Sequence, residues 1–140
     1  MKSVFADTSF YAAMLSVRDE AHDAANRWSL TVTGSVVTTE FVLVELGNGV
    51  RGENRRKAFA EFVSRLRAMP DTIIVPASGE LFRAGMDLFE RRADKDWSVT
   101  DCISFVVMQQ RGISEALTAD HHFEQAGFKA LLREGSPDIP

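Results

Sequence analysis

The chain has 140 residues, of which 45% are hydrophobic and 26% are charged, a composition that predicts one ordinary globular domain. No apolar run approaches the ~18 residues that span a bilayer, and Asp7 comes too early for a secretion signal, so we expect a cytoplasmic protein that does not bind membranes. The formal net charge of −4 argues against a general nucleic-acid-binding protein, which is usually basic. A nuclease that neutralises its acidic site with divalent cations escapes this argument, and the local clusters of Arg and Lys fit both solvated helix faces and an RNA-binding surface.

Short apolar segments typical of strands alternate with longer segments of helical periodicity. In chain order the pattern predicts a strand over 3–6, helices over 10–15 and 19–30, a strand over 34–37, helices over 41–46 and 55–69, and a strand over 72–75. A helix from Ser78, a helix over 98–111, a strand over 116–119, a helical turn over 123–126 and an edge strand over 130–132 follow. Strands separated by helices predict an α/β fold with a mostly parallel sheet covered on both faces. We expect one domain over 1–133 and a tail over 134–140.

Two acidic residues directly follow predicted strands. Asp7 ends the first strand and Asp120 ends the strand over 116–119. Asp7 could also cap the next helix, although Thr8 or Ser9 would serve equally well, and Asp120 alone could be an ordinary loop residue. Function collects at the carboxyl ends of parallel strands, so both residues are candidates for a site.

Two further acidic residues lie in predicted helices. Glu45 has apolar neighbours on both sides in the segment 41–46, and a carboxylate buried there would be costly without a metal or cation; a narrow solvent-facing stripe is the alternative. Asp101 fits a capping box with Ser98, but the apolar helix that follows makes this helix end a candidate edge of the site.

Together the four carboxylates predict a cation site. In a parallel sheet Asp7, Asp101 and Asp120 can share one rim, with Glu45 pointing into it from a neighbouring helix. Two ionised carboxylates ~5 Å apart repel each other by roughly 3 kcal/mol at an effective dielectric constant of about 20, so the cluster needs cations. Oxygen ligands favour Mg²⁺ or Mn²⁺ over zinc.

The histidines and the cysteine have simpler explanations. His121 and His122 are adjacent, lack the spacing of a zinc motif and are interpreted as polar loop residues, and His22 lies in an early surface helix. Cys102 lies in an apolar run without basic neighbours, so we expect a buried, reduced thiol rather than a nucleophile.

Four segments of the chain, 4–9, 39–48, 97–105 and 117–123, resemble in order the motifs of the PIN-domain family. The closer likeness is to VapC-type ribonuclease toxins of toxin–antitoxin pairs. The resemblance implies a three-layer α/β/α fold and an endoribonuclease that depends on Mg²⁺ or Mn²⁺. It assigns the catalytic and metal-ligating positions to Asp7, Glu45, Asp101 and Asp120. Small polar residues at Thr8, Ser9, Asn48 and Thr118 would orient a ligand or a metal-bound water.

The resemblance also implies partners and a mechanism. RNA would be the substrate, a cognate antitoxin would cover the active site, and the chain would form a homodimer. Metal-activated water would hydrolyse the RNA phosphodiester bond, leaving a 5′-phosphate and a 3′-hydroxyl, without a histidine base or a serine nucleophile.

Three alternatives stay open at the level of sequence. Phosphatases of the haloacid-dehalogenase type begin with an Asp after the first strand, but they need a second Asp where this chain has Ser9. A receiver domain would need paired acids near the first strand, which this sequence lacks. A non-catalytic binding module would use the acids only as helix caps, and it would not be stabilised by divalent cations.

Overall fold

A five-stranded sheet forms the centre of the molecule, in the order β3-β2-β1-β4-β5, and all neighbouring strands are parallel. The structure is a computed structural model that describes residues 2–135 and 137. The prediction of a mostly parallel sheet is confirmed. The strands are β1 (Val4–Ala6), β2 (Val36–Thr39), β3 (Thr72–Val75), β4 (Glu115–Leu117) and β5 (Lys129–Ala130).

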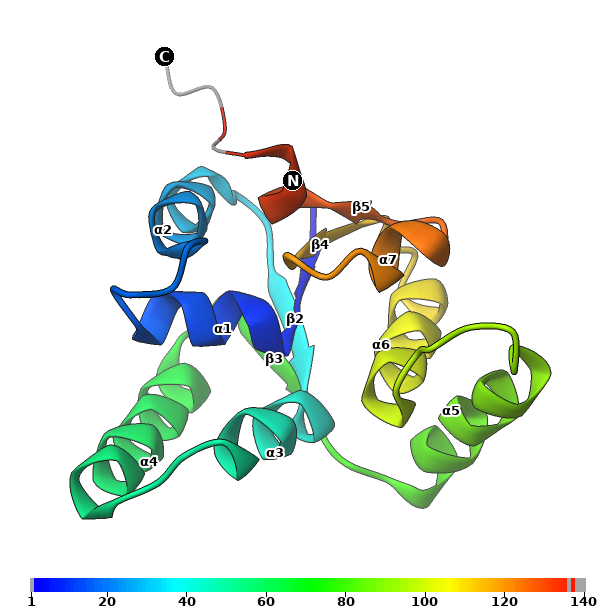
Figure 1. Ribbon diagram of the computed structural model, residues 1–140, viewed down its shortest axis with the longest axis horizontal. Coiled ribbons are helices and arrows are strands. Elements are labelled where there is room, and N and C mark those ends of the chain that lie inside the picture. Colours follow the sequence, from blue (N-terminus) through cyan, green and yellow to red (C-terminus); the bar gives the residue numbers. More distant parts are fainter. Residues whose placement is uncertain (1, 136, 138–140) are drawn as a thin grey trace.

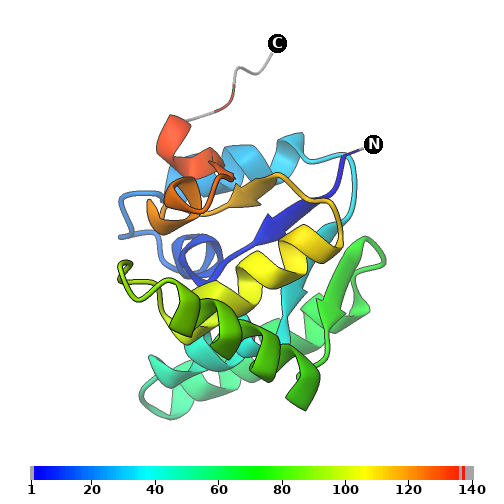
Figure 2. The same cartoon turned by 90° about the vertical axis from the view of Figure 1, so that its right-hand side faces the viewer.

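Helices cover both faces of this sheet. Figure 1 shows α1, α2 and α4 on one side of the sheet and α5 and α6 on the other, and Figure 2 shows α5 and α6 lying across the front of the strands. This arrangement confirms the predicted three-layer α/β/α fold. The helices are α1 (Thr8–Leu15), α2 (His22–Thr31), α3 (Glu40–Asn48), α4 (Glu53–Ala68), α5 (Gly79–Arg91), α6 (Val99–Gln110), α7 (His122–Gln125) and the 3-10 helix η1 (Leu131–Glu134).

The strand order reverses direction at β1. The chain runs from β1 to β2 and β3 on one side, and β4 and β5 lie on the other side. Ligands of open α/β sheets bind outside the carboxyl ends of the strands at such a reversal of direction. This switch point lies between the ends of β1 and β4, which Asp7 and Asp120 follow.

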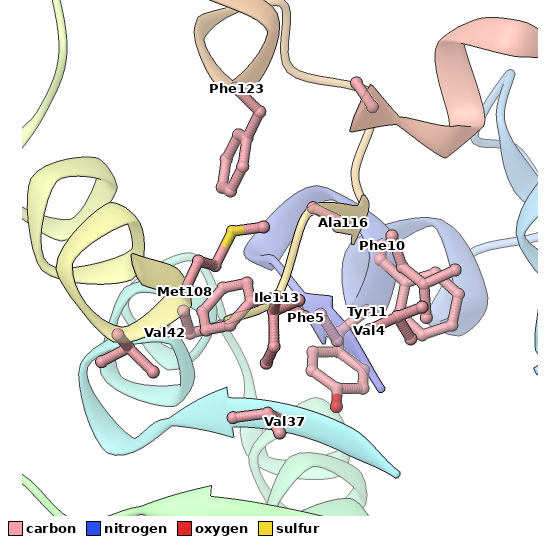
Figure 3. Packing of buried hydrophobic residues seen from close by; sticks show 14 of the residues in the cluster. Val4, Phe5, Phe10, Tyr11, Val37, Val42, Met108, Ile113, Ala116 and Phe123 are labelled. Atoms are coloured by element: carbon pink, nitrogen blue, oxygen red, sulfur yellow. The ribbon is translucent and has the colours of Figure 1, made fainter. Parts of the chain in front are cut away.

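Aromatic packing fixes the elements around this switch point. The residues of β1 are all buried, as in a central strand covered on both faces. Figure 3 shows Phe5, Met108 and Phe123 in the core, and the rings of Phe105 and Phe123 meet edge to face with centroids 4.9 Å apart. Phe123 therefore ties α7, and the loop before it, to α6 and β1.

The C-terminal part differs from the expectation. The edge strand predicted over 130–132 is wrong beyond Ala130, because Leu131 and Leu132 belong to η1 and the Leu132 N–H donates to the Thr118 carbonyl. Of the predicted tail, Glu134 ends η1 and the Gly135 carbonyl accepts a hydrogen bond of 2.7 Å from Trp28 Nε1. Residues 136 and 138–140 lie outside the described residues.

Candidate active site

Asp7 lies at the end of β1, and its side chain does not cap the helix that follows. It occupies the N-cap position of α1 but makes no capping hydrogen bond through its side chain, and only 4% of the residue is exposed. Its Oδ2 atom accepts hydrogen bonds from Thr118 Oγ1 at 3.0 Å and from Ser9 Oγ at 3.4 Å. Asp7 thus links the end of β1 to the segment after β4 through hydroxyl groups.

Burial changes the acidity of Asp7. Desolvation raises the pKa of its carboxyl group from 3.8 to about 7, and the negative charges of Asp101 and Glu45 act in the same direction. The Thr8 N–H and the Thr118 hydroxyl lower the pKa and offset only part of this effect. A buried carboxylate with such a perturbed pKa is a candidate for a functional site.

Asp101 combines a structural role with a position in the site. The predicted capping box is present: the Asp101 N–H donates to Ser98 Oγ, and Asp101 Oδ2 accepts from the Ser98 N–H, both at 3.0 Å. The residue is only 6% exposed. Burial and the charges of Asp120 and Glu45 raise its pKa, while Ser98 and His122 lower it.

Glu45 reaches the site by a different route from the one expected. The interpretation that it lies in apolar surroundings is wrong: α3 buries Val42 and Leu43, while Val44 and Glu45 are exposed. Glu45 instead lies on a solvent-facing stripe of α3, which is the alternative given for it from the sequence. Even so, Glu45 Oε1 accepts a hydrogen bond of 2.6 Å from Thr8 Oγ1, and its charge raises the pKa of Asp7 and Asp101.

Asp120 stands half-buried in the loop after β4. Its N–H donates to Thr118 Oγ1 at 3.0 Å, and its Oδ1 atom accepts from the His122 N–H at 2.9 Å. Thr118 therefore contacts Asp120 and Asp7 together, which brings the two strand-end acids to one place as predicted from the parallel sheet.

The four smaller polar residues do not all reach the carboxylates. Thr8, Ser9 and Thr118 contact them directly, and the Ser9 and Thr118 hydroxyls also lie 3.0 Å from each other. Asn48 is exposed at the end of α3, and its backbone carbonyl accepts from Arg51. Within residues 2–135 and 137, no hydrogen bond joins the Asn48 side chain to a carboxylate, so its role stays a prediction.

His122 belongs to the site, although its sequence context indicates only a polar loop residue. Its Nδ1 atom lies 3.1 Å from Asp120 Oδ1 and 3.4 Å from Asp101 Oδ2. A position two residues after a strand-end acid, at the first turn of a helix, is the signal that could have indicated it.

Cys102 is a buried free thiol, as expected, and burial raises its pKa.

The residues present fit a divalent cation. Asp7 and Asp101 are buried and acidic, and their pKa values are raised partly by neighbouring carboxylates. Protonation or a bound cation can relieve this repulsion, and oxygen-rich donor sets select hard cations. Asp120, His121 and His122 each bring one ligand atom within 4.8 Å of the other two. Of the two histidines, only His122 also lies beside Asp101, with its Nδ1 atom 3.4 Å from Asp101 Oδ2, whereas His121 is exposed.

The three-layer α/β/α fold and its cluster of carboxylates are those expected of a PIN domain, and the family comparison agrees. The model of the PIN domain family matches residues 4–129, and the chain belongs to this family. Its similarity is to the VapC branch: it is 32% identical over 132 residues to the 23S rRNA-specific endonuclease VapC20 in two strains of Mycobacterium tuberculosis, covering 94% of this chain and 99% of the relative.

A solved structure supports the same relationship. The crystal structure of Mycobacterium tuberculosis VapC20, described as a sarcin-ricin loop cleaving toxin, superposes with a TM-score of 0.80 at 26% sequence identity. The match covers 89% of this chain and 95% of that one.

In the part of this chain that the structure describes, none of the helices has the length and apolar character needed to cross a membrane.

Proposed function

We propose that this chain is a metal-dependent endoribonuclease and the toxin component of a type II toxin–antitoxin system. One observation carries the proposal: two buried carboxylates, Asp7 and Asp101, lie with Glu45 and Asp120 around the end of the central strand. The membership in the PIN family and the endonuclease relatives support the same function. A helix-capping role alone does not explain Asp7, since its side chain makes no capping hydrogen bond.

The proposed ligands of Mg²⁺ or Mn²⁺ are the four carboxylates Asp7, Glu45, Asp101 and Asp120. The metal, when bound, would lower the pKa of a water molecule and offset charge on the phosphate. The chain itself supplies the orientation. The hydroxyls of Ser9 and Thr118 hold Asp7, the Ser98 N–H holds Asp101 and Thr8 holds Glu45. Such fixed donors keep ligands in place before the substrate arrives.

The proposed substrate is RNA, and the proposed product ends are a 5′-phosphate and a 3′-hydroxyl. The relatives named above are specific for 23S rRNA, so a sarcin-ricin loop transcript is the first substrate to test. The acidic site would repel the RNA backbone unless cations were present, which makes metal binding a condition of RNA binding as well as of cleavage.

The proposal also includes two protein partners, an antitoxin and a second copy of the chain. A cognate antitoxin would cover the active site, the chain would form a homodimer, and the pair would act in the cytoplasm. Co-expression with the product of a neighbouring short reading frame, followed by purification and light scattering, tests both partners. We expect one stable complex without ribonuclease activity.

The central experiment compares three variants in cleavage of purified RNA, with sequencing of the product ends. We expect Asp7→Asn and Asp101→Asn to lower turnover by at least about 100-fold, because each removes a charged ligand. Asp87→Asn is the matched control, because Asp87 is exposed on α5, a helix that carries none of the four carboxylates. Thermal melts establish that the variants are folded. Wild-type turnover in either site variant would rule out the carboxylate mechanism.

A further inference from the structure

We propose that His122 is a metal ligand through its Nδ1 atom, together with Asp101 and Asp120, so that the site offers nitrogen as well as oxygen donors. The inference rests on the proposed metal-dependent nuclease and adds a residue to its metal site. It also changes which cation the site should prefer.

The distances between the donor atoms fit a shared cation. His122 Nδ1 lies 3.1 Å from Asp120 Oδ1 and 3.4 Å from Asp101 Oδ2. Neighbouring donors with metal bonds of about 2.1 Å are about 3.0 Å apart in an octahedron and about 3.4 Å apart in a tetrahedron. The distance from His122 Nδ1 to each of the two carboxylate oxygens is therefore that of neighbouring donors around one ion.

The Nδ1 atom of the His122 ring makes no hydrogen bond with the described residues. The atom is also buried. Its distance to Asp120 would permit a hydrogen bond, but the direction does not. Buried polar atoms usually have a partner, and one without a partner calls for an explanation such as an ion. A cation between the ring and the two carboxylates supplies that explanation.

The surrounding contacts hold this arrangement in place. The backbone N–H of His122 donates to Asp120 Oδ1 at 2.9 Å. This hydrogen bond holds the start of α7 against the loop that carries Asp120. Phe123 is fully buried against Phe5 and Phe105 and anchors the next position. On the other side, the Ser98 N–H fixes Asp101 Oδ2. Each carboxylate oxygen keeps a second lone pair for a metal.

The neighbouring histidine provides a matched control. His121 is exposed, with 56% of its side chain accessible, and its Nδ1 atom lies 3.8 Å from Asp120 Oδ1. The His122 side chain is 21% accessible and faces two carboxylates. The two residues have the same chemistry and neighbouring positions, so a difference between their variants reports geometry.

A nitrogen ligand has a consequence for metal selectivity. Mg²⁺ is held in proteins by oxygen donors, whereas imidazole suits transition metals. We therefore expect His122 to favour Mn²⁺ over Mg²⁺ more strongly than four carboxylates alone would.

The experiment uses the full chain, freed of divalent ions, with substoichiometric MnCl₂. Pulsed electron paramagnetic resonance should detect a directly coordinated ¹⁴N nucleus in the wild type and in His121→Gln, and not in His122→Gln. The Kd for Mn²⁺ should rise at least about tenfold in His122→Gln, with a smaller rise for Mg²⁺ in competition. His121→Gln should keep both constants.

Several results would overturn the inference. They are bound Mn²⁺ without a nitrogen signal in the wild type, no binding of Mn²⁺, or a His122→Gln protein that keeps the nitrogen signal. The wild-type spectrum needs no variant, so a folding defect in His122→Gln cannot hide the answer. RNA cleavage in Mg²⁺ is measured separately. Cleavage without a nitrogen signal removes only this inference, and a nitrogen signal without cleavage removes only the proposed nuclease.

Discussion

At the scale of a residue, Asp7 shows how burial in the fold opposes the ionisation of a carboxyl group. Its pKa is raised to about 7 because burial disfavours the charged form. Between about pH 4 and pH 7 the metal-free folded chain therefore keeps a proton that the unfolded chain releases. The folded state binds more protons, so the free energy of unfolding falls as the pH rises. The stability that protonated Asp7 contributes to the metal-free fold is fully present below about pH 4 and is lost as the pH rises through 7.

This linkage predicts the stability profile of the metal-free protein. In EDTA, urea denaturation should show a loss of up to about 4 kcal/mol from Asp7 between pH 4 and pH 8. Asp7→Asn removes the titrating group while keeping the shape of the side chain, so its profile should be flatter over this range. Parallel profiles for the wild type and the variant would mean that Asp7 does not hold a proton in the fold.

Thr118 is the residue whose loss should disturb the site most widely without removing a charge. It is fully buried, donates to Asp7 Oδ2 and accepts from the Asp120 N–H. Thr118→Val keeps the volume but removes the acceptor of the Asp120 N–H and leaves Asp7 Oδ2 with only the Ser9 hydroxyl, so we expect a loss of about 1–3 kcal/mol in the free energy of unfolding. Urea denaturation measures it, and Thr31→Val on the exposed end of α2 should stay within about 0.5 kcal/mol of wild type.

The sequence allowed part of the site to be predicted at this scale. The positions of Asp7 and Asp120 follow from where strands end, and the capping box of Asp101 follows from local spacing. Glu45 could not be understood from its apolar neighbours, because the orientation of α3 depends on packing against distant elements. His122 was missed because its proximity to Asp101 joins residues of two elements, α7 and α6, through tertiary structure.

At the scale of elements, α5 and α6 pack closely at a glycine. A Cβ atom at Gly85 would lie 2.3 Å from Ile103 Cγ1 and 3.3 Å from the Ile103 backbone. Gly85→Ala should therefore lower the free energy of unfolding by about 1–3 kcal/mol, since overpacking outweighs the better helix propensity of Ala. Because α6 carries Asp101, RNA cleavage should fall as well.

Gly49 supplies the control for this prediction. A Cβ atom there meets only the Leu46 carbonyl oxygen at 3.7 Å, an ordinary contact, and its φ of −85° suits any residue. Urea denaturation of Gly49→Ala should change little. If Gly85→Ala were as stable as wild type, the close approach of α5 and α6 would not exist in the folded protein.

Elements with strong periodicity were predictable and the short C-terminal ones were not. The alternation of apolar strands and amphipathic helices gave the parallel sheet and its layers. The order of β3, β2, β1, β4 and β5 was not predicted, because the choice of neighbouring strands depends on contacts between segments far apart in the sequence. At the C-terminus, β5 ends at Ala130 because Leu132 donates its N–H to the Thr118 carbonyl, a long-range choice that no local pattern reveals.

At the scale of the whole molecule, charge and topology meet at one edge of the sheet. The formal net charge is −4, and the carboxylates whose charges raise the pKa values of Asp7 and Asp101 gather near the ends of β1 and β4. The fold thus concentrates negative charge at the place where parallel sheets bind ligands. Repulsion among these charges lowers stability, and we expect a bound cation to relieve it.

A divalent cation should therefore stabilise the entire fold. A ligand present at 100 times its Kd adds about 2.7 kcal/mol to the free energy of unfolding, which raises the Tm of a chain of this size by about 10 °C. Thermal melts with MnCl₂ or MgCl₂, against NaCl at matched ionic strength, measure this rise. Asp7→Asn and Asp101→Asn should lose most of it, while Asp87→Asn should keep it. Equal melting temperatures with and without the divalent salt would favour acids that act only as helix caps, because capping involves no ion.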